Sequence, residues 1–166
     1  MADGTGPLTR CGIDTVQIAR VERLLLGTPQ EDLLRIFSRE ELCDVGEGPG
    51  RTASLAARFA AKEACLKLFP RETALGLIGP ADFAVARDAY GAPHVVCSPR
   101  VVELIARHRL KAIAVSLAHD KTSASAVAVA EPAFPEGQGS LGEPDRPTQR
   151  LGSGPTRPTV LPPSPH

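Results

Sequence analysis

The segment RFAAKEACLK, residues 58–67, places a carboxylate and an ammonium group four residues apart, at Glu63 and Lys67. On a helix this spacing puts both side chains on one face, and Ala56 and Ala60 lie on the same side. One interpretation is an ordinary surface ion pair, which contributes about 0.2–0.5 kcal/mol. The other is a functional site, because small side chains let a backbone or a ligand approach the helix closely.

Two residues outside this segment also have the chemistry of a site. Asp14 ends the stretch LTRCGID, where a predicted strand gives way to a helix, and its position favours a turn or capping carboxylate. His119, in SLAHD, falls in the loop between the last two predicted strands. It is either a phosphate contact or a surface histidine hydrogen-bonded to Asp120.

Two cations accompany the apolar stripe of the same central helix. Lys62 falls in the middle of this stripe and Arg58 lies beside it. The stripe consists of Leu55, Phe59, Leu66 and Phe69. This arrangement predicts either a solvated helix edge, with the lysine stem lying along apolar surface, or a site for a ligand with phosphate and apolar parts.

Composition excludes several classes of function. The chain has 166 residues, 42% apolar and 4% aromatic, with a formal net charge of zero, so we expect one domain that does not bind nucleic acid non-specifically. We expect neither a secretory signal in MADGTGPLTR nor a membrane span, which needs about 18 apolar residues in a row. Four cysteines without a Cys-x-x-Cys pair read as buried free thiols and suggest the reducing cytoplasm rather than a zinc site. They are Cys11, Cys43, Cys65 and Cys97.

The composition changes after Glu131. Residues 132–166 contain nine of the sixteen prolines and five of the fifteen glycines, which predicts a disordered tail. The expected organisation is therefore a flexible N-terminus over 1–9, one domain over 10–131 and this tail.

Local signals within the domain predict an α+β fold, with one helix inserted in an antiparallel sheet of three or four strands. Ser38 and Glu41 form a capping-box pattern, Pro70 ends the long helix, and Ser98 followed by Pro99 begins the last helix. The expected helices span residues 15–27, 38–45, 52–69 and 98–109, and the expected strands span 8–14, 82–88, 94–97, 111–117 and 123–130.

The order of four motifs along the chain resembles the holo-acyl-carrier-protein synthase family of 4′-phosphopantetheinyl transferases. The motifs are Gly-Ile-Asp at the first strand, RFAAKEAxxK on the long helix, GAPHV in the hairpin and SLAHD before the last strand. The resemblance covers residues 10 to 130 and implies that family's fold, a small antiparallel sheet packed with a long central helix. It implies transfer of 4′-phosphopantetheine from coenzyme A to a serine of an apo-acyl-carrier protein, with release of adenosine 3′,5′-bisphosphate.

The resemblance also assigns roles to residues. Asp14 and Glu63 would hold Mg²⁺ together with the pyrophosphate of coenzyme A. Lys67 would reach the same phosphates or protonate the leaving oxygen. The cofactor-binding set would comprise Arg58, Lys62, Lys67 and His119. Either Glu63 or a metal-bound water would take the serine proton.

Partners follow from the same resemblance. An acidic apo-acyl-carrier protein would dock on the first helix at Arg20 and Arg23, although these arginines are equally consistent with plain surface charge. The family is typically a homotrimer with sites between subunits. We expect a role in fatty acid biosynthesis, although the sequence alone does not distinguish a fatty acid, polyketide or peptide carrier. Two other functions remain open: a non-catalytic carrier-binding protein of the same fold, and a general binder of phosphate ligands.

The sequence departs from the family pattern in two places. Residues 68–79, LFPRETALGLIG, replace a shorter glycine turn that lines the pyrophosphate, and Gly76 and Gly79 either substitute for that turn or it is lost. Ala118 removes a hydroxyl before His119, and the tyrosine common after it is absent. These changes bear on coenzyme A affinity more than on metal binding.

Overall fold

A computed structural model describes residues 8–133. Its helices are α1 (Ile18–Gly27), α2 (Gln30–Leu33), α3 (Arg39–Asp44), α4 (Arg51–Leu66), α5 (Arg71–Ala74) and α6 (Pro99–Arg107), with a 3-10 turn η1 (Pro80–Asp82). Its strands are β1 (Arg10–Gln17), β2 (Phe83–Arg87), β3 (Pro93–Cys97), β4 (Leu110–His119) and β5 (Ser123–Pro132). The flexible N-terminus and the disordered tail predicted from the sequence lie outside the described residues, except for 8–9 and 132–133. Pro132 closes β5 and is buried, so the folded part extends past the expected boundary at residue 131.

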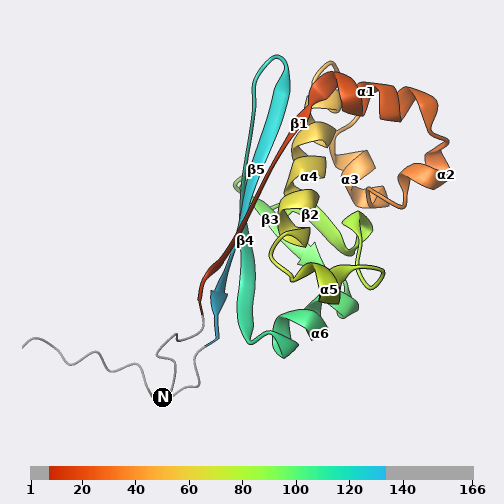
Figure 1. Cartoon of the computed structure of the whole chain (residues 1–166). Coiled ribbons are helices and arrows are strands. Elements are labelled where there is room, and N and C mark those ends of the chain that lie inside the picture. The colour runs from red at the N-terminus through yellow and green to blue at the C-terminus, as the bar shows by residue number, and fades with distance from the viewer. Residues whose placement is uncertain (1–7, 134–166) are drawn as a thin grey trace, which may run out of the picture. The chain divides into compact units, whose positions relative to one another are not determined.

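The strands form two antiparallel sheets (Figure 1). One has three strands in the order β1-β5-β4, and the other is the β2-β3 hairpin, which contacts β4 through β3. The predicted α+β class is confirmed, but the strands do not make one continuous sheet. None of the helices of residues 8–133 is long and apolar enough to cross a bilayer.

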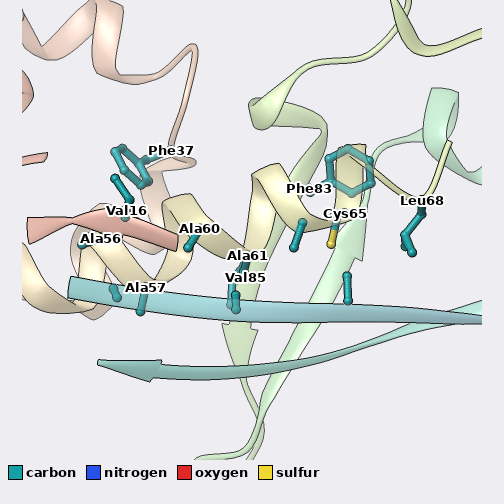
Figure 2. Packing of buried hydrophobic residues seen from close by; sticks show 14 of the residues in the cluster. Val16, Phe37, Ala56, Ala57, Ala60, Ala61, Cys65, Leu68, Phe83 and Val85 are labelled. Carbon is teal, nitrogen blue, oxygen red and sulfur yellow. The ribbon is translucent and has the colours of Figure 1, made fainter. Parts of the chain in front are cut away.

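Alanine faces bring α4 onto the three-stranded sheet. Four of the five inward positions of β5 are alanine, and they meet the alanines of α4 (Figure 2). The set comprises Ala124, Ala126, Ala128 and Ala130 on the strand and Ala56, Ala57, Ala60, Ala61 and Ala64 on the helix, all buried. The alanine face of the central helix therefore admits the backbone of the sheet. Of the two partners that the small side chains could admit, the backbone is the one found, because Ala56 and Ala60 have no exposed surface to offer a ligand.

Gly12 makes the closest contact between β1 and α4. A Cβ at this position would lie 2.0 Å from the Ala64 carbonyl oxygen and 3.1 Å from the Lys67 Cβ. Only glycine allows the backbone of β1 to lie this near the helix. The glycine of the Gly-Ile-Asp motif thus sets the distance between the strand that carries Asp14 and the helix that carries Glu63.

The opposite face of the three-stranded sheet carries no helix among the described elements (Figure 1). Cross-strand rows on this face are apolar or small, and Ile13 is 61% exposed. Two of the rows are Cys11–Val129–Ala114 and Ile13–Val127–Ser116. An apolar face of this kind is typical of a surface that another molecule covers.

The cysteines differ from the prediction that all four are buried. Cys65 is buried and Cys97 is half-buried, whereas Cys11 and Cys43 are exposed. Burial raises the pKa of the Cys65 thiol to about 12, so it stays protonated at neutral pH. Cys11 is exposed because it lies on the uncovered face of the sheet.

Candidate active site

Asp14 lies within β1, not at its end. The strand continues to Gln17, and Asp14 is paired with Ala126 of β5, so it neither caps α1 nor forms a turn. Its neighbours at alternate positions, Gly12 and Val16, are buried under α4, so the Asp14 side chain is on the same face of the sheet as that helix.

Lys67 connects the two elements. Its ammonium group donates to the Asp14 Oδ1 at 2.9 Å and to the Ile13 carbonyl oxygen at 2.6 Å. The lysine therefore pairs across to β1 and is not simply the surface partner of Glu63 on its own helix. The close contact at Gly12 permits this bridge, because it brings β1 against the C-terminal turn of α4.

Glu63 belongs to the same cluster. Burial raises the pKa of the Glu63 carboxyl, the nearby Asp14 charge raises it further, and Lys67 and Arg20 oppose the shift. The contact of Gly12 with Ala64 brings the strand of Asp14 against the helix of Glu63, so two acids that are 49 positions apart in the sequence lie close enough for their charges to interact. We call Asp14, Glu63 and Lys67 the acidic cluster.

The donors of the acidic cluster suit a magnesium ion. They are two carboxylates and a backbone carbonyl oxygen, all hard oxygen donors. Residues 8–133 contain no group of three His, Cys, Asp or Glu side chains placed to hold a metal. Magnesium does not need one, because it is commonly held by one or two carboxylates with waters and substrate phosphates. Lys67 already places a positive charge against Asp14.

A separate pocket of about 190 Å³ brings basic side chains together. Arg58, Arg87 and His119 line it, beside Ser54 and the hairpin residues around Gly91. Arg58 is only 3% exposed, and its Nε has no hydrogen-bond partner among the described residues. A buried donor without an acceptor is costly, so this pocket has the chemistry of an anion site. We call it the arginine pocket.

Asp44, at the end of α3, is the counter-ion of the arginine pocket. Its carboxylate pairs with the Arg58 guanidinium and lies 3.7 Å from the Arg87 Nε. Burial lowers the pKa of Arg58, and the charge of Asp44 opposes this shift. Neither Asp44 nor Arg87 was predicted from the sequence, because nothing in the local pattern links them to Arg58.

His119 is the last residue of β4, not a loop residue. It is opposite Ala124, a buried position under α4, and it lines the arginine pocket. Asp120 accepts hydrogen bonds from the backbone N–H groups of Thr122 and Ser123, which lower the pKa of its carboxyl to about 2. Asp120 therefore stabilises the turn between β4 and β5. It is not the hydrogen-bond partner of His119 that one interpretation of the sequence predicted.

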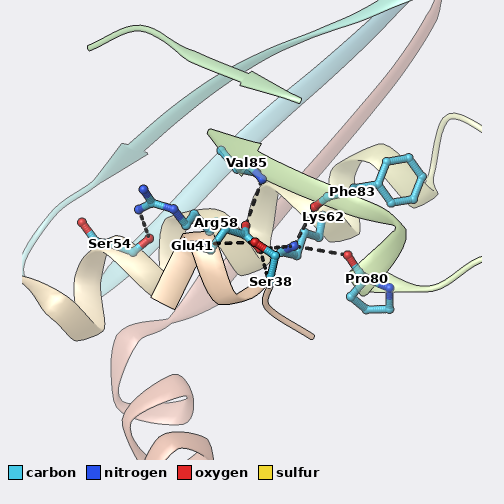
Figure 3. A network of polar contacts seen from close by, with 8 residues as sticks. All are labelled: Ser38, Glu41, Ser54, Arg58, Lys62, Pro80, Phe83 and Val85. Carbon is cyan, nitrogen blue, oxygen red and sulfur yellow. Dashed lines mark hydrogen bonds and ion pairs between the residues drawn. The ribbon is translucent and has the colours of Figure 1, made fainter. Parts of the chain in front are cut away.

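Lys62 is a correction to the predicted cofactor-binding set. Its side chain has no exposed surface, and its ammonium group donates to the Glu41 Oε2 at 2.8 Å and to the Phe83 carbonyl oxygen at 2.6 Å (Figure 3). The lysine does not extend along the stripe to solvent, because an acidic partner lies inside the core. With its donors used there, Lys62 cannot meet a phosphate at the surface.

The acidic cluster and the arginine pocket lie along opposite sides of α4. Asp14 is on β1 and His119 on β4, the two edge strands on either side of β5, and two strand spacings amount to about 10 Å. On α4 itself, Arg58 and Glu63 are five residues apart and so project about 140° from each other. The structure thus brings Asp14, Glu63 and Lys67 together, and separately brings Arg58 and His119 together.

Beside the acidic cluster, α1 and α4 enclose a hollow of about 390 Å³. Arg20 and Arg23 line it with apolar side chains, including Leu24 and Phe59. Arg20 is near enough to Glu63 to lower its pKa, so this basic and apolar hollow adjoins the acids.

Comparison with known proteins places the chain in a family. Residues 10–130 match the 4′-phosphopantetheinyl transferase superfamily, to which the chain therefore belongs. It is similar to holo-[acyl-carrier-protein] synthases of Moorella thermoacetica, with 37% identity over 78% of this chain and 98% of that protein, and of Treponema denticola, with 37% identity over 72% and 95%.

Solved structures agree with this assignment. The holo-[acyl-carrier-protein] synthase of Neisseria meningitidis superposes with a TM-score of 0.61 at 27% identity, covering 74% of this chain and 97% of that one. The Helicobacter pylori enzyme, solved in complex with coenzyme A, superposes with a TM-score of 0.60 at 27% identity, covering 73% and 99%.

Proposed function

We propose that this protein is a holo-[acyl-carrier-protein] synthase, which transfers 4′-phosphopantetheine from coenzyme A to a serine of an apo-acyl-carrier protein. The observation that carries the proposal is the acidic cluster, in which β1 and α4 bring Asp14, Glu63 and Lys67 together. The relatives named holo-[acyl-carrier-protein] synthase, and the coenzyme A bound to the Helicobacter pylori enzyme, support the same substrates.

The residues of the acidic cluster have distinct roles in this proposal. Asp14 and Glu63 would hold Mg²⁺, which when bound neutralises charge on the pyrophosphate of coenzyme A. Lys67 would exchange its contact with Asp14 for one with the phosphates, and its ammonium would protonate the leaving oxygen. Glu63 is a candidate acceptor for the serine proton, because its carboxylate lies in the cluster beside Arg20.

The arginine pocket would take a further phosphate of coenzyme A. Arg58, Arg87 and His119 supply donors to one pocket, and guanidinium groups suit phosphate oxygens. Arg58 and His119 therefore stay in the cofactor-binding set, Arg87 joins it, and Lys62 leaves it.

The carrier protein would dock on the hollow between α1 and α4. Arg20 and Arg23 offer positive charge to an acidic partner, and the apolar floor accepts side chains from it. Because Arg20 adjoins Glu63, a serine delivered to this hollow arrives beside the acidic cluster.

A homo-oligomer would complete the site. The acidic cluster and the arginine pocket line opposite edges of one sheet, so a heterologous contact between copies places the pocket of one beside the cluster of the next. Such contacts close into a ring, and the uncovered apolar face of β1, β5 and β4 gives the copies a surface to bury. The homotrimer implied by the family resemblance fits this arrangement. Sedimentation equilibrium measures its stoichiometry, and a stable monomer with full activity would contradict it.

Fatty acid biosynthesis in the cytoplasm is the proposed setting, in keeping with the free thiols Cys11 and Cys43 at the surface. The deciding experiment incubates the protein with apo-carriers of several pathways, coenzyme A and Mg²⁺. A carrier whose mass increases by one phosphopantetheine group supports the enzyme. Carrier binding without a change of mass would support the alternative, a non-catalytic carrier-binding protein.

A further inference from the structure

Glu41 and Lys62, two charged residues that the proposed reaction does not itself use, form a buried polar network that joins α3, α4 and β2. Glu41 of α3 and Lys62 of α4 are 2% and 0% exposed, and their charges lie 2.8 Å apart (Figure 3). Lys62 also donates to the Phe83 carbonyl oxygen at 2.6 Å and to the Pro80 carbonyl oxygen at 3.3 Å. The network thus reaches η1 and the first residue of β2.

The carboxylate of Glu41 is equally occupied. Its Oε2 also accepts from the Ser38 N–H at 2.7 Å, which completes the capping box of α3, and its Oε1 accepts from the Val85 N–H of β2 at 2.9 Å. Burial lowers the pKa of the Lys62 ammonium, and the charge of Glu41 opposes this shift. Both charged groups are therefore held by directional bonds to α3, α4 and β2.

The same three elements meet a second time at the arginine pocket. Asp44 follows Glu41 by one turn of α3, Arg58 precedes Lys62 by one turn of α4, and Arg87 follows Val85 by two residues of β2. At the arginine pocket, Asp44 forms ion pairs with Arg58 and Arg87. In the buried network, Glu41 forms an ion pair with Lys62 and accepts from the Val85 N–H. The two levels are about 5–6 Å apart, the separation of side chains one helical turn from each other.

We propose that Glu41 and Lys62 form a positioning pair, which fixes α3, α4 and β2 so that Arg58 and Arg87 converge on one anion. Stability alone is a poor reason for this pair, because replacing a buried ion pair by apolar groups is often neutral or stabilising. Apolar packing is not directional, whereas three acceptors around one ammonium fix its direction. The inference rests on the proposed function, since it takes the arginine pocket as a coenzyme A site.

The test compares steady-state KM values for coenzyme A and for apo-carrier, measured on folded protein. Lys62→Met alone leaves the Glu41 charge unpaired and is expected to lower Tm. The double variant Glu41→Gln/Lys62→Met removes both charges, so we expect Tm to recover. We expect its KM for coenzyme A to stay about tenfold above the original, because a small misplacement of binding groups has effects of this order. Its KM for the carrier should not change.

Two further variants separate the possible outcomes. Val101→Ala removes buried apolar volume from α6, which does not contribute to the arginine pocket, so it should lower Tm without changing the KM for coenzyme A. Arg87→Ala tests the pocket directly and should raise that KM. If Arg87→Ala raises it and the double variant does not, the positioning role is wrong while the proposed function stands. If Arg87→Ala has no effect, the pocket is not a coenzyme A site and both assignments fall, whatever the double variant does.

Discussion

Gly12→Ala tests whether the contact between β1 and α4 assembles the acidic cluster. The new Cβ would lie 2.0 Å from the Ala64 carbonyl oxygen, and real Cβ atoms stay at least 3.0 Å from other heavy atoms. Because the obstacle is helix backbone, strand and helix must separate by about 1 Å. Overpacking of this kind costs about 1–3 kcal/mol, which lowers Tm by about 4–12 °C in a domain of this size.

The same displacement moves Asp14 away from Glu63 and Lys67. A misplacement of about 1 Å reduces catalysis by about 10²-fold, so phosphopantetheine transfer by folded Gly12→Ala should fall by that factor. The assay follows carrier mass well below the Tm of the variant, over a range of Mg²⁺ concentrations. Gly48→Ala is the matched control, because a Cβ there meets nothing within 4 Å. A Gly12→Ala protein with normal Tm and a transfer rate within about twofold of the original would refute this reasoning.

Three further predictions concern the acids and the docking hollow. Asp14→Asn and Glu63→Gln should each reduce transfer by more than about 10²-fold with circular dichroism unchanged, and normal turnover would exclude a metal at these residues. Because the pKa of Glu63 is raised, its protonation favours the folded protein without metal, and this benefit is lost as pH rises through the raised pKa. Mg²⁺ must displace that proton to bind Glu63. The rise in Tm that Mg²⁺ causes should therefore be larger at about pH 7.5 than at about pH 5. A rise in Tm that does not depend on pH would contradict the assignment of Glu63 as a ligand. Arg20→Glu should raise the carrier KM about tenfold and leave the KM for coenzyme A unchanged. The control Arg100→Glu on α6 should change neither KM. Equal effects of the two variants on the carrier KM would mean that net charge, and not the position of Arg20, decides docking.

Features of the fold with local causes were predicted well from the sequence. The capping box of Ser38 and Glu41, the start of α6 at Ser98 and the hairpin around Gly91 all depend on residues within a few positions of each other. The ends of strands that depend on a partner far away in the sequence were predicted less well. We expected β1 to end at Asp14, but pairing with β5 carries it three residues further, to Gln17.

The same distinction explains the errors in the candidate site. Both interpretations of Lys62 carried its ammonium outward, to solvent or to a ligand, because its partner, Glu41, lies 21 positions earlier and already had a local role in the capping box. The alanines beside Glu63 correctly indicated close approach, but the pattern does not say whether a ligand or a strand approaches. The proximity of Asp14 to Glu63 came from the family resemblance, because no spacing rule links residues so far apart.

The pairing of β1 with β5 has a consequence for biosynthesis. Arg10 pairs with Ala130, and β5 is the only strand beside β1 among the described residues. The strand β1 is therefore made early but cannot pair in its sheet until β5 has been made. Contacts between such distant segments slow folding, because the chain must close a large loop before the contacts stabilise it. A nascent chain that lacks residues beyond about 120 would hold the helix with Glu63 but leave the strand with Asp14 without a partner. Such a chain would acquire its catalytic centre only after β5 has been made, which pulse-labelled translation with timed addition of coenzyme A and apo-carrier would reveal.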